Sequence, residues 1–487
     1  MHPNRPAARR PRAFIPKHMS ERRKVVVIGA GPAGYVCAIR LAQLGQEVIC
    51  VEKQYMGGTC LNVGCIPSKA LIAAGSLMDK ISHADRMGIS VEGVKLDVGA
   101  LVKWKDGIVG KLTGGVGGLL KNHGVKVLRG AGKILDRQRV QVSGGEDGEH
   151  ILEVDDIVIA TGSAPINIPG FDCDEDNVWS STGGLRPTKI PERLVVIGGG
   201  YIGLELGMMY AKLGSSVTVL EASPGALPGQ ERDCVKVIER SMKKLGMTLK
   251  TETFAKGWEA RGSEKVVRVE GKNGAEEIVC DQILSTVGRK PYSEGLGLEN
   301  VGLSLDERGF LLVDNQLRTK VPNIYAIGDI AGQPMLAHKG SKEGLVAAAV
   351  IAGQPDEYDS KCVPAVIFTA PEMASVGLTE DQCKEQGLNY KAGSFPFAAS
   401  GRAMSLMETD GFVKILSDAE TDEVLGVHMV GPEVTELIAE AALAIEMGAT
   451  VEDIARTIHA HPTLPEAMME AAEAVHTMAV HIYQKPK

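Results

Sequence analysis

Two cysteines in this chain, Cys60 and Cys65, are spaced closely enough to act together. They stand five positions apart in the segment GGTCLNVGCIPSK, with Lys69 at its end. A structural disulfide would close a loop too short to gain much chain entropy, and a zinc site would need further ligands at a matching spacing. The sequence has no second CxxC and no HxxxH to complete such a site. We therefore predict a redox pair, with one thiol exchanging with a substrate and the other facing an electron acceptor, and no metal site.

A histidine and a glutamate near the C-terminus could supply the acid–base chemistry that such a pair needs. His461 and Glu466 lie in the segment HAHPTLPE. The thiolate is the reactive form of a thiol, and at neutral pH most thiols are protonated, so a nearby imidazole is useful as proton acceptor. A carboxylate would fix the tautomer of that imidazole and raise its basicity. We predict these roles for the two residues.

Two segments that could position these side chains repeat one pattern without a gap. Residues 25–52 and 194–221 each contain an apolar strand, a GxGxxG, a helical pattern, a second strand and a closing glutamate, at a constant offset of 169 positions. A GxGxxG in this strand–turn–helix context is the fingerprint of a dinucleotide-binding βαβ unit. The fingerprint glycines are Gly29, Gly31 and Gly34 in the first repeat and Gly198, Gly200 and Gly203 in the second.

The closing glutamates indicate which dinucleotides the repeats bind. Glu52 and Glu221 are each expected to bind a ribose diol. No arginine follows Glu221 in the next four residues, AlaSerProGly, so NAD is favoured over NADP. Two sites in one chain need two different dinucleotides to have a chemical use. FAD in the first and NAD in the second would form a hydride relay.

Composition limits the function classes. A chain of 487 residues is too long for one hydrophobic core, and its net charge of −8 gives no general basic surface for nucleic acid. Nine cysteines, scattered and odd in number, indicate a reducing compartment. The apolar runs are interrupted by Gly and Pro, so we expect no membrane segment. We predict a cytoplasmic protein with a basic disordered extension at residues 1–23; a mitochondrial transit peptide is the alternative interpretation of that extension.

Several motifs then point to one family. They are the first GxGxxG, GGTCLNVGCIPSK at 57–69, ATGS at 160–163, the second GxGxxG, NIYAIGD at 323–329 and HAHPTLPE at 459–466. In this order they resemble the dihydrolipoamide dehydrogenase family of flavoprotein disulfide oxidoreductases, a group that includes glutathione reductase. The resemblance covers nearly the whole chain beyond Arg23, and the cysteine segment is its most specific part.

The resemblance implies a role for each residue of the redox centre. Cys60 would be the exchange thiol, and Cys65 would lie against the flavin and pass electrons to it. Lys69 would lie near the flavin N5 edge with Glu205 as its partner. His461 would come from the second subunit, so the active enzyme would be a homodimer.

The resemblance also implies cofactor contacts outside the fingerprints. Asp329 would bind the ribityl chain of FAD, and a helix starting near His338 would point its amides at the flavin. The remaining predicted contacts are Lys69, Thr161, Gly162 and Ala337 for FAD and Gly288 for NAD. One departure is the segment AHKGSKEG at 337–344, where the resemblance leads us to expect an alanine at Gly340 and an acid at Lys342.

The expected fold is α/β, with two Rossmann-like dinucleotide-binding domains and an α+β C-terminal dimerisation domain. We place an FAD-binding domain with the redox disulfide at 24–165, an NAD-binding domain at 166–288, the central part of the FAD domain at 289–360 and the interface domain at 361–487. The small-residue helices of the last part have the apolar period of a packed interface.

The predicted function is that of a dihydrolipoamide dehydrogenase, which oxidises dihydrolipoyl groups through the Cys60–Cys65 disulfide and FAD and reduces NAD⁺. Its partners would be lipoyl domains and the core acyltransferase of 2-oxo acid dehydrogenase complexes, or the H protein of glycine cleavage; the sequence does not choose between them. The IPSK segment and the absence of an arginine after Glu221 favour this function over a glutathione reductase-like one. A non-catalytic flavin-binding scaffold subunit is the alternative from another class, and the retained cysteines and His461 count against it.

Overall fold

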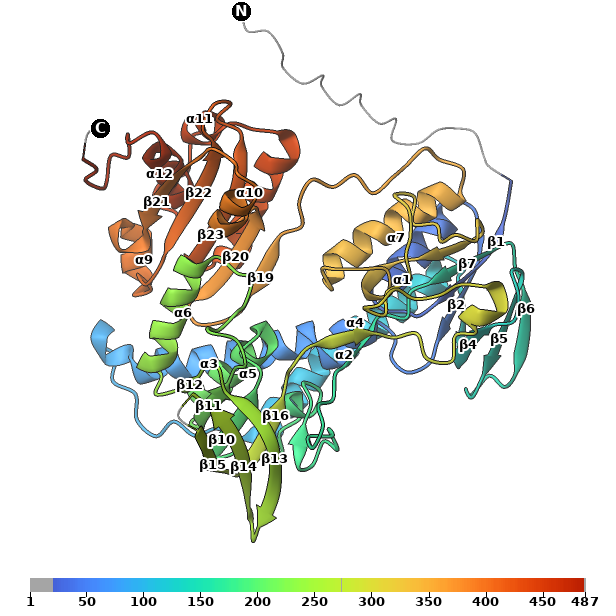
Figure 1. The fold of residues 1–487 in the computed structure, drawn as a ribbon, viewed down its shortest axis with the longest axis horizontal. Helices are drawn as coiled ribbons and strands as arrows, with labels where there is room; N and C mark the ends of the chain where they lie inside the picture. Colours follow the sequence, from blue (N-terminus) through green and yellow to red (C-terminus); the bar gives the residue numbers. More distant parts are fainter. Residues whose placement is uncertain (1–20, 273, 486–487) are drawn as a thin grey trace, which may run out of the picture. The chain divides into compact units, whose positions relative to one another are not determined.

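The computed structural model describes residues 21–272 and 274–485, which form two compact units. Of these residues, unit 1 holds 21–58, 112–163 and 291–359, and unit 2 holds 59–111, 164–290 and 360–485. The chain passes between the units within α2 (Gly58–Val63) and α4 (Val98–Asn122) (Figure 1). It also passes between them within β8 (Ser163–Pro165), within β17 (Arg289–Pro291) and after residue 359. The predicted basic extension and its transit-peptide alternative lie almost entirely outside the described residues.

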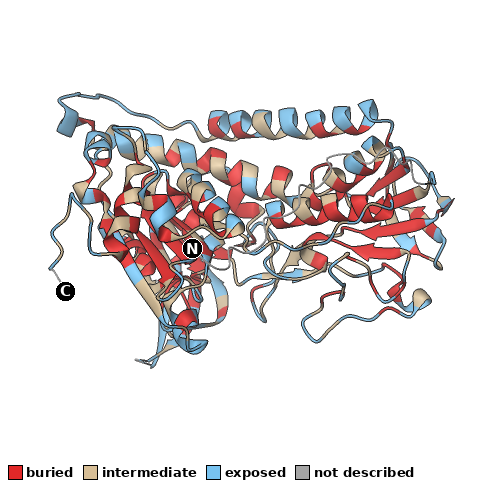
Figure 2. Cartoon of the chain, turned by 90° about the horizontal axis from the view of Figure 1, so that it is seen from above, coloured by how far each residue is buried: buried red, intermediate tan, exposed pale blue. Residues whose placement is uncertain are grey.

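Unit 1 is built on a five-stranded parallel sheet of order β18-β7-β1-β2-β3. Its strands are β1 (Lys24–Ile28), β2 (Glu47–Glu52), β3 (Lys126–Arg129), β7 (Asp156–Ile159) and β18 (Ile324–Ala326). Their apolar, β-branched residues are buried on both faces, as expected of a parallel sheet (Figure 2). The other elements are α1 (Pro32–Gln43), which packs on α7 (Ala337–Ile351), the turns η3 (Leu298–Val301) and η4 (Gly328–Ile330), and an antiparallel sheet of β4 (Ala131–Ile134), β5 (Arg139–Ser143) and β6 (His150–Glu153).

Unit 2 contains a second five-stranded parallel sheet, of order β12-β11-β10-β16-β9. Its strands are β9 (Val178–Trp179), β10 (Arg193–Ile197), β11 (Ser216–Leu220), β12 (Thr248–Lys250) and β16 (Gln282–Ser285). An antiparallel sheet consists of β13 (Phe254–Arg261), β14 (Glu264–Gly271) and β15 (Gly274–Cys280). The accompanying helices and turns are α3 (Cys65–Ser82), η1 (Ala84–Met87), η2 (Gly183–Leu185), α5 (Tyr201–Lys212) and α6 (Arg232–Lys244).

The C-terminal part of unit 2 is α+β, with an antiparallel sheet of order β19-β20-β23-β22-β21. The strands are β19 (Ala365–Ile367), β20 (Glu372–Gly377), β21 (Tyr390–Pro396), β22 (Phe412–Asp418) and β23 (Val424–Gly431). The helices are α8 (Glu380–Glu385), η5 (Phe397–Ala399), α9 (Gly401–Leu406), α10 (Val434–Met447), α11 (Val451–Ala455) and α12 (Glu466–Val475), of which α10 and α12 pack on the sheet. The predicted fold class is thus confirmed.

The two predicted βαβ repeats have the same backbone. β1 pairs with β2 from Lys24↔Glu47, and β10 pairs with β11 from Arg193↔Ser216, both in parallel. Gly29 and Gly198 have φ angles of +108° and +103°, which favour glycine over residues with a Cβ. The constant offset of the sequence repeat therefore extends to the register of the strands.

The predicted domain boundaries differ from the compact units at one place. The boundaries after 165, 288 and 360 lie within two residues of those between the units, but residues 59–111, which we assigned to the FAD-binding domain, group with unit 2. The reason is the packing of α3 on α5: Leu71 is fully buried in a core that includes Leu204, and a Cβ at Gly75 would lie 3.4 Å from Met209 O.

One helical stretch of the described residues, Gly58–Ser82, is long and apolar enough to span a membrane by length and composition alone. A buried helix of a globular core has the same composition. Its most apolar window is 39% buried within the protein, and the stretch contains the cysteine pair and Lys69. The packing of α3 on α5 accounts for its apolar character.

Candidate active site

The two cysteines meet where α2 ends and α3 begins. Cys60 is half-buried in α2, and Cys65 is an exposed residue that opens α3; both are free thiols and they share a hydrogen bond. Gly64 makes the turn between them. A Cβ on Gly64 would lie 2.9 Å from Thr59 O and 3.3 Å from the Cα of Cys60. The glycine therefore lets the chain turn tightly enough for the two side chains to meet.

The ionisation of the two thiols is unequal. The hydrogen bond from Cys60 and, to a smaller extent, the ammonium of Lys69 lower the pKa of Cys65 to about 7 against the effect of burial. The same hydrogen bond, together with burial, raises the pKa of Cys60 well above its ordinary value. Cys65 also stands at the N-terminus of an 18-residue helix, where the backbone dipole favours a thiolate. In the reduced pair, Cys65 therefore ionises at a lower pH than Cys60.

Lys69 lies one helical turn after Cys65 and is held by two residues from distant parts of unit 2. Its Nζ is 2.8 Å from Oε2 of Glu205, whose side chain is almost completely buried on α5. Oε1 of Glu205 accepts a hydrogen bond of 2.9 Å from the backbone amide of Phe368, and the Phe368 ring centroid lies 4.3 Å from the Lys69 Nζ. The structure thus brings together the predicted Lys69–Glu205 pair and adds Phe368, which no motif of the sequence indicated.

His461 and Glu466 are in contact at the start of α12. The imidazole Nδ1 of His461 is 2.9 Å from Oε1 of Glu466, and the Thr463 amide donates to Oε2 at 2.8 Å. Burial opposes ionisation of Glu466, but these two partners hold its pKa below its ordinary value. The His461 side chain is 82% exposed. A carboxylate bound to Nδ1 leaves Nε2 available for proton transfer.

The fingerprint glycines are required by their surroundings. A Cβ on Gly29 would lie 2.3 Å from Ala160 O, and one on Gly34 would lie 1.9 Å from Gly29 O. In the second repeat a Cβ on Gly198 would lie 2.6 Å from Thr286 O, and one on Gly203 would lie 2.1 Å from Gly198 O. The first and third glycines of each fingerprint thus allow a tight turn and close packing of the helix.

The middle glycines leave room for a dinucleotide. No atom would lie within 4 Å of a Cβ on Gly200, and the nearest to one on Gly31 would be the Gly58 Cα at 3.9 Å. Gly31 and Gly200 are the N-caps of α1 and α5, and neither helix has a side-chain cap. Open backbone at an uncapped helix N-terminus suits a pyrophosphate, so both repeats fit the cofactors predicted for them.

The two closing glutamates bind the glycine turns. Oε2 of Glu52 accepts from the Ala30 amide at 2.7 Å, and its other oxygen accepts from the amides of Gln54 and Tyr55. Glu221 repeats this arrangement with the Gly199 and Ser223 amides, both at 2.7 Å. Both carboxylates are thus fixed by backbone amides, and their binding of a ribose remains a prediction.

Two of the other predicted cofactor residues, Asp329 and Thr161, have hydrogen-bond partners nearby. In unit 1, Ser163 Oγ donates to Oδ2 of Asp329, and Thr161 Oγ1 donates to Tyr292 O at 2.6 Å. Gly162, Ala337 and the exposed His338 belong to the same unit, and α7 begins at Ala337, as predicted within one residue. In unit 2, Gly288 has a φ of +122°. Ser163 was not among the predicted site residues, although the ATGS motif contains it.

Three carboxylates in unit 2 converge in a way that could suggest a cation site. Glu231, Asp233 and Glu380 offer oxygens within 4.8 Å of one another. The Nζ of buried Lys414 lies 2.8, 2.9 and 2.7 Å from these three side chains. The cluster therefore binds the ammonium group of Lys414, and it joins α6 to the C-terminal sheet.

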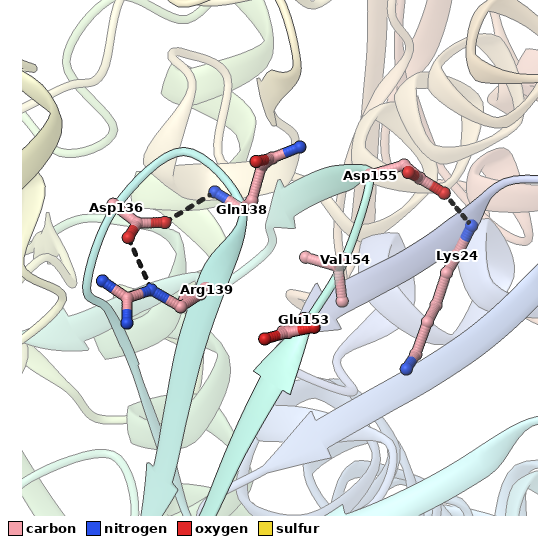
Figure 3. Close-up of a pocket in the computed structure, with 7 residues that line it drawn as sticks. All are labelled: Lys24, Asp136, Gln138, Arg139, Glu153, Val154 and Asp155. Atoms are coloured by element: carbon pink, nitrogen blue, oxygen red, sulfur yellow. Dashed lines mark hydrogen bonds and ion pairs between the residues drawn. The ribbon is translucent and has the colours of Figure 1, made fainter.

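A polar cavity of about 430 Å³ lies in unit 1, outside the predicted sites (Figure 3). It is lined by Lys24, Asp136, Gln138, Arg139, Glu153, Val154 and Asp155. Asp136 accepts hydrogen bonds from the Gln138 amide and the Arg139 side chain, and Asp155 accepts one from the Lys24 amide. These groups bind one another, and the lining contains no residue of the redox centre or the fingerprints.

Comparisons with known proteins agree with this geometry. The chain matches the family model described as pyridine nucleotide-disulphide oxidoreductase at residues 23–344 and the model of its dimerisation domain at 363–472. It is 49% identical over 464 residues to a dihydrolipoyl dehydrogenase of Thermus scotoductus, covering 95% of this chain and 99% of that protein. It is 50% identical over 458 residues to the dihydrolipoyl dehydrogenase of Bacillus subtilis, covering 94% and 97%.

Solved structures give the same picture. LpdA of Mycobacterium tuberculosis matches with a TM-score of 0.87 at 28% identity, covering 92% of this chain and 99% of that one. RclA of Escherichia coli, described as an HOCl-induced flavoprotein disulfide reductase, matches with a TM-score of 0.83 at 27% identity, covering 92% and 99%.

Proposed function

Because the chain belongs to the pyridine nucleotide-disulphide oxidoreductase family and carries its dimerisation domain, we propose that its cysteine pair oxidises dihydrolipoyl groups for NAD⁺ reduction. The protein is an oxidoreductase that uses FAD and NAD, with relatives about half identical that are named dihydrolipoyl dehydrogenase. The observation that carries the proposal is the contact of the Cys60 and Cys65 thiols beside the Lys69–Glu205 pair.

Each repeat supplies most of the residues that would hold one of the two cofactors. The first fingerprint with Glu52 and Asp329 would hold FAD, and the second with Glu221 would hold NAD. When bound, FAD supplies two-electron transfer between the cysteine pair and NAD. The chain contributes open glycine turns, uncapped helix N-termini and fixed carboxylates to this arrangement.

The dithiol chemistry belongs to the chain's own residues. The reaction starts with Cys60 and Cys65 joined as a disulfide. His461 of the partner subunit accepts a proton from one substrate thiol, and the resulting substrate thiolate attacks the Cys60 sulfur. The Cys60–Cys65 bond breaks, and Cys65 leaves as a thiolate. The second substrate thiol displaces Cys60 from the mixed disulfide and its proton passes to the departing Cys60 sulfur, so that the lipoyl disulfide forms and Cys60 becomes a thiol. Two electrons are then held by the reduced pair, in which the pKa of about 7 lets Cys65 ionise near neutral pH.

Partners and compartment form the finer part of the proposal. The dimerisation domain supports a homodimer. We propose lipoyl domains and the core acyltransferase of 2-oxo acid dehydrogenase complexes, or the H protein of glycine cleavage, as partners. We propose a cytoplasmic location, since the relatives that align over nearly the whole chain include bacterial proteins such as those of Thermus scotoductus and Bacillus subtilis. These relatives do not support a mitochondrial transit peptide.

A steady-state assay tests the substrate and the nucleotide together. Dihydrolipoamide with NAD⁺ should be turned over at least about a hundredfold more efficiently than reduced glutathione, or than dihydrolipoamide with NADP⁺. Preference for glutathione would refute the lipoyl assignment. Anaerobic NADH should also produce a long-wavelength absorption band from the Cys65 thiolate beside flavin. A flavin-loaded protein without the band or turnover would instead be the scaffold subunit.

A further inference from the structure

An ion pair on α7 of unit 1 is buried although the dithiol chemistry does not use it. The Nζ of Lys339 lies 2.9 Å from Oε1 of Glu343, and each side chain is only 5% exposed. Burial raises the pKa of Glu343, and the ammonium of Lys339 opposes that shift. Taking two charges out of water is unfavourable before their attraction is counted, and apolar side chains would often stabilise the fold equally well.

Both side chains form hydrogen bonds with the backbone of one short loop. The Gly328 amide donates to Oε2 of Glu343 at 2.7 Å, while Nζ of Lys339 donates to Gly332 O at 2.9 Å and to Gly328 O at 3.4 Å. Gly328 and Gly332 have φ angles of +76° and +148°. The loop between them contains the turn η4 and Asp329. The amide and the carbonyl of the residue before Asp329 are thus both bound by the ion pair.

The helix that carries the pair is itself fixed on α1. A Cβ on Gly344 would lie 2.6 Å from Ala33 O, and one on Gly340 would lie 3.1 Å from Ala33 Cβ. Ala33 also limits the loop, because a Cβ on Gly328 would lie 3.0 Å from its Cβ. The first fingerprint helix, α7 and the loop of Asp329 therefore form one closely packed block.

We propose that Lys339 and Glu343 are positioning residues of the flavin site, which hold the Gly328–Gly332 loop so that Asp329 is presented to FAD. This inference rests on the proposed function, because that function places FAD at Asp329. It extends the proposed function from residues that would contact the cofactor to residues that act through one of them.

The experiment measures FAD affinity by titrating FAD into flavin-free protein and following the quenching of flavin fluorescence. Lys339→Met and Glu343→Gln should each weaken FAD binding about tenfold, because each removes hydrogen bonds between a charged group and the loop. The double variant K339M/E343L removes both charges, so it should recover thermal stability but keep the weakened FAD affinity. If the single variants fail to fold, the FAD affinity of the double variant tests the proposal by itself.

A matched control separates loop positioning from general stability. Lys414→Met removes another buried, ion-paired lysine, in unit 2, and should lower the melting temperature while leaving FAD affinity unchanged. Wild-type FAD affinity in K339M/E343L would overturn the inference, as would an equal loss of affinity in Lys414→Met. If the wild-type protein does not bind FAD, the proposed function itself fails, which is a distinguishable result.

Discussion

Helix α1 of the first repeat and helix α5 of the second start at equivalent positions, but different helices pack against them. Helix α7 packs on α1 through its glycines, and Gly344 lies close to Ala33 and Cys37. Helix α5 receives α3, and its Glu205 binds Lys69 there. At the position equivalent to Glu205, the first repeat has Val36. The repeats therefore share a dinucleotide-binding backbone, and one substituted side chain connects the second repeat to the cysteine pair.

The largest expected effect comes from a change in the cysteine pair that should abolish turnover but leave FAD binding by the first repeat intact. Cys60→Ser should reduce dihydrolipoamide turnover by at least about a thousandfold, because the Cys60–Cys65 disulfide that the substrate thiolate attacks can no longer form. FAD content should stay at the wild-type level, since no fingerprint residue changes. Flavin absorbance and the steady-state rate measure the two properties on one sample. Substantial turnover by the variant would contradict the mechanism.

Replacing the first glycine of each fingerprint by alanine, in separate variants, tests whether the repeats bind different dinucleotides. Gly29→Ala places a Cβ against Ala160 O, and Gly198→Ala places one against Thr286 O, each at a positive φ. Each change should destabilise the folded conformation of its glycine turn by roughly 2–4 kcal/mol. We expect Gly29→Ala to lose FAD and Gly198→Ala to keep FAD while binding NADH at least about tenfold more weakly. Loss of FAD from both variants would contradict the assignment of one cofactor to each repeat.

Lys69→Met tests the side chain that joins α3 to the second repeat. The ammonium lowers the pKa of Cys65, so its loss should move the thiolate titration to higher pH and leave less than half of Cys65 ionised at pH 7. Thiolate absorbance of the reduced pair should still rise with pH, but later than in the wild type, where the midpoint is about 7. We expect turnover at pH 7 to fall about tenfold.

Lys80→Met is the matched control for this titration. Lys80 lies on the same helix, and its ion pair with Glu408 is largely exposed. The titration of Cys65 should therefore be unchanged in this variant. An equal shift in both variants would show that the effect comes from helix stability instead of the local charge.

The smallest expected effect compares one glycine on α7, which packs on the first repeat, with one on α5 of the second repeat. A Cβ on Gly340 would lie 3.1 Å from Ala33 Cβ and 3.3 Å from Gly328 Cα, which are parts of a rigid block. A Cβ on Gly207 of α5 would meet the flexible Met247 Cε at 3.3 Å. We expect Gly340→Ala to destabilise by about 1 kcal/mol and Gly207→Ala to be neutral or slightly stabilising, as measured by urea unfolding. The reverse order would contradict the packing argument.

The predicted elements that agreed best with the structure are those set by local rules. The βαβ units and their glycine turns follow from apolar strands and from glycine stereochemistry, so they could be predicted residue by residue. The partnership of Lys69 with Glu205 came only from the family resemblance, because the two residues are 136 positions apart. Phe368 was missed, since nothing in its own segment marks it as a neighbour of Lys69.

The grouping of residues 59–111 shows the same limit at the scale of a domain. Sequence order placed this stretch with the first repeat, but Leu71 and Gly75 pack on α5 of the second. An apolar helix face indicates that the helix is buried, but several partners in the chain could bury it equally well. Shape complementarity between distant segments selects one of them.

The sequence by itself determined the two dinucleotide-binding repeats, the spacing of the paired cysteines and the His461–Glu466 spacing, because each depends on neighbours within one or two elements. The tertiary structure alone decided that Phe368 packs over Lys69 and that Lys339 and Glu343 grip the loop of Asp329. These contacts depend on which buried surfaces fit together, and that fit is a property of the folded chain as a whole.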